Sequence, residues 1–366
     1  MDLSRRHLLQ LSGATVAGVV LFDGASASAS PRQQRLYLGS YTSSGGRGVA
    51  AGTIESATGA VHLDGWNHAV ADPSWLAASS NGARLYAVSE LVPDGTVSAL
   101  HPARSGPPTV SHAEPTGWGP THAQVHPTGR FLFVAHYGTG GLAVHPIDAD
   151  GRLGPATDTH EHAHGSHVHQ VVTDPSGRWL LVADLGLDAI FVYAFDERDG
   201  RLRAHGQTPL RAGAGPRHLA FHPSGGYVYV AAELNSTVTV LRWADGGLTP
   251  VQVVGTLLRP TATRNYPGEI LSSTDGRFVY VTNRGDDSVV VYAVSHGGSR
   301  LALVARAPSG GQWPRHAAID RTGRWLFVAN QRSDELTMFA LDPEQGLLSG
   351  PIGRLPAPAV ACVLVV

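Results

Sequence analysis

The sequence predicts an all-β protein, a single seven-bladed β-propeller with four-stranded blades whose ring is closed by strands from both ends of the chain. A pattern of about 48 residues occurs six times between residues 73 and 331. Repetition with this period is typical of propellers. Strand-like segments at 35–41 and 358–364 supply a seventh, split copy. No long amphipathic helix separates the copies, which argues against a parallel α/β fold.

Each copy begins with a short strand, usually opened by proline, and carries a glycine nine positions after its opening residue. The opening residues are Pro73, Pro120, Val168, Pro216, Pro267 and Pro314, so the copies are spaced by 47 to 51 residues. The glycine predicts a tight turn, and a strand rich in aromatic residues or leucine follows it. A second alternating strand, such as 237–241, and a turn with Asp or Gly then lead to a fourth, outer strand. Four strands in such a repeat make one blade.

The seventh blade is expected to combine the two chain ends. Residues 358–364 form an apolar run that matches the opening strand of the other copies, and residues 35–41 match the strand that follows it. Pairing these segments closes the ring and removes exposed sheet edges. Residues 31–366 are therefore predicted to form one domain.

Residues 1–30 have the features of a secretion signal. Arg5 and Arg6 are followed by two leucines, an apolar stretch covers 8–22, and small residues occupy 25–29. Paired arginines before leucine resemble a twin-arginine signal, so we expect cleavage in the small-residue run and export of the folded protein. An ordinary secretory leader and an uncleaved anchor are the alternatives. The apolar stretch is short for a stable membrane span, and we expect no span after cleavage.

The composition limits the classes of function. The net charge of −2 gives no basic surface for nucleic acid, so no nucleic-acid partner is expected. All 27 basic residues are arginine, because the chain has no lysine. This excludes a Schiff-base lysine and a phosphate-loop lysine, and leaves arginine to hold a carboxylate or a phosphate. The single cysteine, Cys362, lies in an apolar run and is expected to be a buried structural thiol. We expect a monomer that needs no cofactor.

Two positions of the repeat hold polar residues that differ from copy to copy. The first variable position follows the opening residue and holds Ser74, Thr121, His169, Arg217, Gly268, Arg315 and, in the closing copy, Ala359. The second variable position lies eight residues after the repeat glycine and holds Glu90, Tyr137, Leu185, Glu233, Arg284 and Gln331. One position starts the inner strand and the other ends its antiparallel neighbour, so we expect both at one mouth of the central channel. A cluster of such charges shifts pKa values and binds anions.

Several segments carry a family resemblance. They are 215–223 (GPRHLAFHP) with 233–236 (ELNS), and also 283–285 (NRG), 184–186 (DLG) and 39–42 (GSYT). From residue 35 to the C-terminus the chain resembles the lactonase family of seven-bladed propellers. That family includes a bacterial 6-phosphogluconolactonase and a fungal carboxy-cis,cis-muconate lactonizing enzyme.

The resemblance implies a catalytic site of one histidine, two arginines and one glutamate. The motifs place these at His169, Arg217, Arg284 and Glu233, all of which also occupy the two variable positions. The implied chemistry has Glu233 or His169 as general base, one arginine at the developing oxyanion, and the other arginine on a substrate carboxylate or phosphate. Further substrate contacts are expected from Arg315, Tyr137, Glu90 and His167. The structural alternative is that Arg217 and Glu233 form a plain ion pair within one blade.

Two other features concern histidines. His136 precedes Tyr137 where many relatives have asparagine, and we expect this change to alter the channel wall. Five histidines lie within 160–169, which permits a transition-metal site, but the spacing lacks a regular pattern and a solvated loop is favoured. We therefore expect no metal.

Three functions are consistent with these observations. The favoured one is an exported hydrolase that opens a sugar-type or acidic lactone at the channel mouth, similar to a 6-phosphogluconolactonase. The alternatives are a non-catalytic propeller that binds a ligand or partner, and a lactonizing isomerase. No Gly-x-Ser-x-Gly motif is present, which argues against an esterase with a serine nucleophile.

Overall fold

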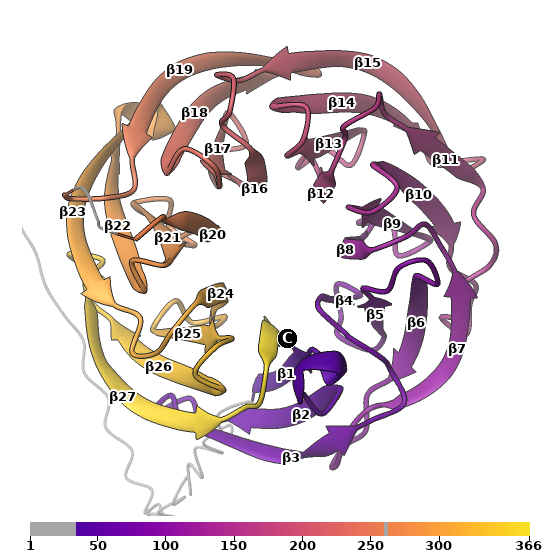
Figure 1. Cartoon of the computed structure of the whole chain (residues 1–366), viewed down its shortest axis with the longest axis horizontal. Coiled ribbons are helices and arrows are strands. Elements are labelled where there is room, and N and C mark those ends of the chain that lie inside the picture. Colours follow the sequence, from indigo (N-terminus) through magenta and orange to yellow (C-terminus); the bar gives the residue numbers. More distant parts are fainter. Residues whose placement is uncertain (1–33, 260–262) are drawn as a thin grey trace, which may run out of the picture. The chain divides into compact units, whose positions relative to one another are not determined.

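The computed structural model describes residues 34–259 and 263–366, and the predicted leader lies outside these residues. The strands form seven four-stranded antiparallel sheets in a ring, so the predicted propeller is confirmed (Figure 1). The described residues contain only two short helices, η1 (Thr42–Ser44) and η2 (His296–Gly298). Within this part of the chain, no helix has the length and apolar character that a membrane crossing requires.

The strands of each blade follow one another in order from the axis outward. The closing blade has β28 (Val360–Val365), β1 (Gln34–Ser40), β2 (Val49–Ile54) and β3 (Val61–Asn67). Blade 2 has β4 (Leu76–Ala78), β5 (Leu85–Ser89), β6 (Thr96–His101) and β7 (Thr109–Pro115). Blade 3 has β8 (Pro120–Val125), β9 (Phe131–His136), β10 (Gly141–Pro146) and β11 (Asp158–Glu161). Blade 4 has β12 (Val168–Thr173), β13 (Trp179–Asp184), β14 (Ala189–Asp196) and β15 (Arg201–Pro209).

The remaining blades have the same arrangement. Blade 5 has β16 (Pro216–Phe221), β17 (Tyr227–Ala232), β18 (Thr237–Ala244) and β19 (Gly247–Gly255). Blade 6 has β20 (Tyr266–Ser272), β21 (Phe278–Arg284), β22 (Ser288–Ser295) and β23 (Arg300–Pro308). Blade 7 has β24 (Pro314–Ile319), β25 (Trp325–Asn330), β26 (Glu335–Leu341) and β27 (Leu348–Pro356).

The ring is closed by the two ends of the described chain, as predicted. β28 is the innermost strand of the closing blade and pairs with β1 from Leu36↔Val365 to Ser40↔Val360. Ser40↔Val360 corresponds to Pro314↔Asn330 in blade 7. Val360 is therefore the opening residue, and the first variable position of this blade holds Ala361, not Ala359 as expected from the sequence. The sequence pattern favours Pro358 as the opening residue because most other copies open with proline. The pairing with β1 shows that the copy opens two residues later.

The core lies between neighbouring blades. Seven clusters of buried apolar side chains each join two adjacent blades, and together they run around the whole ring. One cluster joins Leu36, Val360 and Val363 of the closing blade to Phe327 of blade 7. Burying a side chain of this size stabilises the fold by about 1.5–3 kcal/mol. Each blade is therefore held by two neighbours, including the blade built from both chain ends.

Buried polar side chains hold the turns that follow the second strands. Asp184, at the end of β13, accepts a hydrogen bond from Ser166 Oγ at 2.6 Å and pairs with His162 Nδ1 at 2.6 Å. Asn330, at the end of β25, donates to Thr337 Oγ1 at 2.9 Å. Because the next residue occupies the second variable position, these bonds also fix where that position lies.

Candidate functional site on the innermost strands

A repeated β-bulge directs the first variable position out of each sheet. In blade 5 the register shifts between Pro216 and His218, so Arg217 is the extra residue. Equivalent shifts make His169 the extra residue in blade 4 and Arg315 the extra residue in blade 7. A bulged residue leaves the ladder, and bulges commonly re-aim side chains next to functional sites. The innermost strands surround the axis (Figure 1), so three polar side chains from different blades gather at the end where these strands begin.

Glu233 links two arginines from neighbouring blades. Its Oε2 lies 2.7 Å from Arg284 Nη2 and 3.1 Å from Arg217 Nε. Arg217 Nε is not aligned for a hydrogen bond, but Arg217 Nη1 donates to the Gly268 carbonyl at 2.8 Å. Arg284 donates from Nε to the Tyr266 carbonyl and from Nη2 to the Pro267 carbonyl, each at 3.1 Å. The backbone of blade 6 therefore holds both guanidinium groups around one carboxylate.

A second ion pair joins blade 7 to blade 2. Arg315 Nη2 lies 3.6 Å from Glu90 Oε2, and the same oxygen accepts a hydrogen bond from the Tyr41 hydroxyl at 2.6 Å. The Arg315 guanidinium also lies over the Tyr41 ring, 5.3 Å from its centre. Tyr41 occupies the second variable position of the closing blade. Sequence reasoning missed it because position 33, eight residues earlier, is Gln33 and lacks the marker glycine.

Aromatic side chains flank these charges. His167 stacks on Tyr137 with ring centres 4.3 Å apart, and its Nδ1 donates to the Tyr137 carbonyl at 2.9 Å. The edge of His169 faces Tyr137 at 6.0 Å. Trp313 was not predicted from the sequence, and its ring lies 5.5 Å from the Arg284 guanidinium. Trp313 has φ of 62°, a conformation that L-residues rarely adopt and that is often retained at functional sites.

Burial and charge together set the protonation of the cluster. Burial, reinforced by Arg217, holds the pKa of His169 well below its ordinary value, so the imidazole is neutral at pH 7. Burial lowers the pKa of Arg217 to about 9, with Arg284 and Arg315 acting in the same direction. Burial opposes ionisation of Glu233, but Arg284 and Arg217 outweigh it and lower its pKa. Three arginines and two glutamates leave a net charge of +1, which favours an anionic ligand.

The eight predicted site residues thus occupy one end of the innermost strands. Glu233, Arg217 and Arg284 form one network, Arg315 and Glu90 form a second, and Tyr137, His167 and His169 form an aromatic group. Burial is the largest cause that raises the pKa of Tyr137, and Glu233 and Glu90 both add to it, so this side chain is within electrostatic range of both ion-pair networks. We call these eight residues together with Tyr41 the charged cluster.

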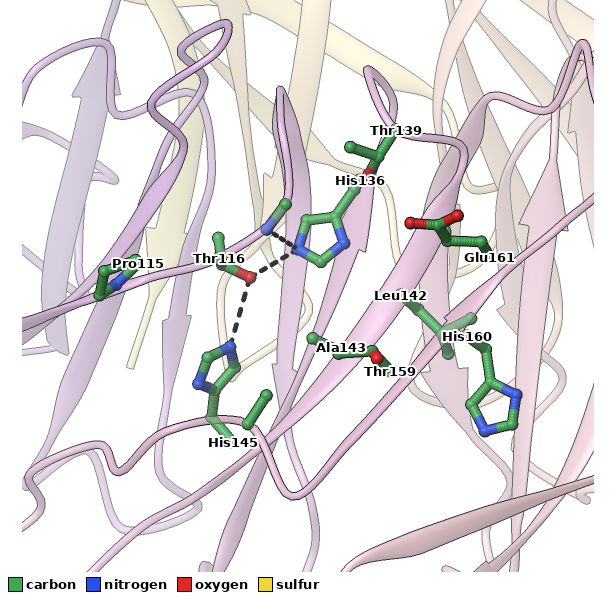
Figure 2. A pocket seen from close by; sticks show the side chains of 13 residues that line it. Pro115, Thr116, His136, Thr139, Leu142, Ala143, His145, Thr159, His160 and Glu161 are labelled. Carbon is green, nitrogen blue, oxygen red and sulfur yellow. Dashed lines mark hydrogen bonds between the residues drawn. The ribbon is translucent and has the colours of Figure 1, made fainter.

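His136 does not face the charged cluster, so the expectation that it alters the channel wall was wrong. Its Nε2 lies 2.6 Å from Thr116 Oγ1 and accepts the Gly117 N–H at 3.1 Å, inside blade 3 (Figure 2). Burial lowers the pKa of His136 to about 3. The ring lines a separate cavity of about 280 Å³ together with His160 and Glu161. Alternation along β9 directs His136 into the blade, whereas Tyr137 follows the strand and turns toward the axis.

The histidines of 160–169 are dispersed. His160 Nε2 lies 3.2 Å from Asp158, His162 binds Asp184, and His169 packs against His218. Among the residues that the structure describes, no group of His, Cys, Asp and Glu side chains is arranged to hold a metal ion.

These features define a class: a seven-bladed β-propeller with an arginine-rich cluster at one end of its innermost strands. The sequence model described as "Lactonase, 7-bladed beta-propeller" matches residues 35–365, and the chain belongs to this family.

Several of its relatives carry lactonase names. The 6-phosphogluconolactonase of Bacillus subtilis is 31% identical over 337 residues, which cover 89% of this chain and 97% of the relative. The 6-phosphogluconolactonase of Yersinia pestis is 30% identical over 291 residues, covering 77% of this chain and 85% of the relative. The structure of a periplasmic gluconolactonase from Pseudomonas aeruginosa superimposes with a TM-score of 0.87 at 30% identity, covering 91% of this chain and 99% of the other.

Proposed function

We propose that this protein is an exported hydrolase that opens a lactone carrying an acidic group, and that the reaction occurs at the channel mouth formed by the charged cluster. The observation that carries the proposal is the Glu233 carboxylate shared by Arg217 and Arg284 beside the neutral imidazole of His169. The lactonase names of several relatives support the reaction class.

The electrostatics favour His169 over Glu233 as the general base. The Glu233 carboxylate is engaged by two guanidinium groups, which lower its proton affinity. His169 is neutral, so a ring nitrogen has a lone pair available. The arginines oppose protonation of His169, and an anionic substrate bound to them offsets that effect. Glu233 then acts by holding Arg217 and Arg284 in place.

The proposed reaction has two steps. Water attacks the lactone carbonyl carbon while His169 takes one of its protons, and the negative charge on the carbonyl oxygen is stabilised by Arg217 or Arg284. The bond between the carbonyl carbon and the ring oxygen then breaks, and the ring oxygen takes the proton from His169. The product is a hydroxy acid, which ionises. Arg315 is placed to hold the acidic group of the substrate.

Export is part of the proposal. The twin-arginine-type segment at the N-terminus supports it, and so does the relative that is described as periplasmic. A phosphorylated sugar lactone arises in the cytoplasm, so export favours an acidic lactone without a phosphate.

The test offers the purified protein gluconolactone, its 6-phosphate and carboxymuconolactone, and follows proton release. We expect Arg217→Ala to lower kcat/KM for the substrate by about 10²–10³-fold, because one oxyanion donor is lost. The control is Arg300→Ala, which removes an exposed arginine of β23.

Three outcomes are informative. Turnover that is lost in Arg217→Ala and kept in Arg300→Ala supports the hydrolase. Equal turnover in both variants contradicts the role of Arg217. Binding of these compounds without proton release favours the non-catalytic alternative.

A further inference from the structure

A second layer of side chains lies directly behind the charged cluster. In each blade the residue after the first variable position belongs to this layer, and these residues are Trp75, His122, Gln170, His218, Glu269, His316 and Cys362. His218 is 1% exposed and Glu269 is 3% exposed. A carboxylate and several imidazoles are therefore buried next to the proposed reaction site without a role in it.

Glu269 is an ionised carboxylate shared by two imidazoles. Its Oε2 lies 2.9 Å from His218 Nδ1 and 2.9 Å from His316 Nε2, and its Oε1 accepts the Ile270 N–H at 3.0 Å. Burial opposes ionisation, but the two imidazoles outweigh it and hold the pKa of Glu269 well below its ordinary value. A carboxylate only accepts hydrogen bonds, so His218 must carry its hydrogen on Nδ1.

This bond fixes the tautomer of His218. Burial lowers the pKa of His218 to about 4, so the ring is neutral at pH 7. With the hydrogen on Nδ1, Nε2 has a lone pair. His218 Nε2 and His169 Nδ1 are both buried and have no hydrogen-bond partner among the described residues. The two rings meet edge to face with centres 5.0 Å apart. Buried polar atoms normally bind protein groups or ordered water, and one water molecule bound between the two rings would satisfy both nitrogens.

Trp75 packs against the histidines of this layer. Its Nε1 donates to the Ala123 carbonyl at 2.9 Å, and its ring centre lies 4.1 Å from His122 and 4.8 Å from His316. A cavity of about 520 Å³ borders this layer and is lined by Trp75, Gln170, Glu269, His316 and residues further along the innermost strands. His218 does not line this cavity, and His169 is its ring neighbour from the charged cluster.

We propose that Glu269 and His218 set the tautomer of His169 and hold its proton between the two steps of lactone opening. The bridging water accepts a hydrogen bond from His169 Nδ1–H and donates one to the lone pair of His218 Nε2. His169 Nε2 therefore has the lone pair that a general base needs. This inference rests on the proposed function.

The proton movement balances at each step. When His169 Nε2 takes a proton from the attacking water, the Nδ1 proton of His169 moves through the bridging water to His218 Nε2. The His218 imidazolium is then paired with the Glu269 carboxylate, and His169 is neutral again. When the ring oxygen leaves, the proton returns by the same path and His169 Nε2 protonates that oxygen. No electron transfer or further reactant is involved.

The test compares Glu269→Gln and His218→Gln with the wild-type protein on whichever lactone it opens. We expect each variant to lower kcat by about 10–100-fold, at most the lower limit of what acid–base catalysis typically contributes, because His169 itself is kept, and we expect little change in KM. The double variant should be no slower than the slower single variant, because both residues act as one unit. The control is His122→Gln, a substitution in the same buried layer that leaves the Glu269 bonds intact, and it should retain kcat.

The pH profile separates this role from simple loss of structure. The groups facing His218 are Glu269, His316, Arg217, His122 and His169, and among them Glu269 raises the pKa of His218 while Arg217 and His316 lower it. Removing the Glu269 charge lowers that pKa further. The fall of kcat at low pH should therefore occur at a lower pH in Glu269→Gln. In a variant that is only less stable, the pH at which kcat falls should not change.

A measurement on the unaltered protein covers the case in which the variants do not fold. Nitrogen NMR of the imidazoles at pH 7 should show His218 protonated on Nδ1 and unprotonated on Nε2, and the opposite tautomer overturns the proposal. Unchanged kcat in both variants, with an active wild type, also overturns it and leaves the hydrolase intact. A wild type that opens no lactone refutes the proposed function, and this inference falls with it.

Discussion

Glu233 has two cationic partners, and this makes it the residue on which the arrangement of the charged cluster depends. Its carboxylate compensates both Arg217 and Arg284, which are almost fully buried. Removing one member of a buried ion pair typically costs about 3–5 kcal/mol, because the remaining charge is left unpaired. A substitution at Glu233 therefore affects stability as well as activity, and it is a poor single test of catalysis. The charged cluster has a net charge of +1, so Arg217→Ala leaves no uncompensated positive charge there. This variant therefore tests catalysis with less effect on stability than a substitution of Glu233.

Asp184 gives a prediction about acid stability. Burial opposes its ionisation, but hydrogen bonds from His162, Ser166 and backbone N–H groups outweigh burial and lower its pKa. Asp184 therefore stabilises the fold above the unfolded pKa of about 3.9, and this contribution is lost as the pH falls through the lower folded pKa. Asp184→Asn should lower the free energy of unfolding at pH 7 by about 1–3 kcal/mol.

Urea unfolding of Asp184→Asn and wild type at several pH values between 7 and 3 measures this effect. The difference between them should narrow as the pH falls. Asp94→Asn changes an exposed carboxyl and serves as the control. If the difference in the free energy of unfolding stays constant down to pH 3, the charge of Asp184 does not contribute to stability.

At the scale of the strand, one local distortion explains why distant residues meet. The bulge near the start of the innermost strand releases one residue from the ladder in blades 3, 4, 5 and 7 and in the closing blade. That residue is free to be Arg, His, Thr or Ala without changing the blade. The position before the opening residue prepares this geometry, since Trp313, Gly215 and Ala359 all have positive φ.

Two glycines with positive φ differ in the space around them. Gly59 lies in the turn between β2 and β3, and Gly45 lies in the turn after β1. Gly59 has φ of 73°, and a Cβ there would lie 2.6 Å from the Trp325 ring of blade 7. Gly45 has φ of 93°, but a Cβ there would meet nothing within 4 Å. Gly45→Ala should lose about 1 kcal/mol through backbone strain alone. Gly59→Ala should lose about 1–3 kcal/mol more because it also displaces Trp325. Thermal unfolding measures both, and equal losses would show that the Trp325 contact is not tight.

The sequence predicted the strands and blades well, but it predicted less well which way individual side chains point. Periodicity placed six blades, because each of these copies repeats the same turn glycine and strand, and the strand-like segments at 35–41 and 358–364 placed the seventh. The two variable positions supplied seven of the eight predicted site residues that the fold brings to one end, all except His167, and their catalytic roles stay predictions. Tyr41 and Ala361 were missed because the closing blade lacks the glycine that marks the register. His136 was misplaced because a sequence does not show which way a residue at a strand end points.

For the molecule as a whole, stability depends on closure of the ring. Val360 and Val363 pack against blade 7, and Cys362 packs in the cluster shared with blade 2. Burial also raises the pKa of the Cys362 thiol to about 12, consistent with a structural role. The last strand therefore contributes to two interfaces at once, and without it both neighbours expose apolar faces.

Deleting residues 360–366 should consequently prevent folding, although it removes only one strand of the propeller. The matched control deletes residues 1–30, which contribute to none of the described strands. Circular dichroism and urea unfolding compare the two proteins. A cooperative unfolding transition in the C-terminal deletion would show that six blades and an incomplete seventh suffice.

The bulges also have a consequence for how such a protein can change over time. A side chain at a bulge belongs to neither the ladder nor the apolar interfaces, so mutation there meets little resistance from the scaffold. Thr121 and Ala361 carry no charge at such positions, while Gly268 is confined by the carbonyls of Pro314 and Arg315. Two positions around the pore are thus available to new functional groups. Divergence of substrate choice among related propellers can proceed by single replacements at these two positions, with the architecture inherited unchanged.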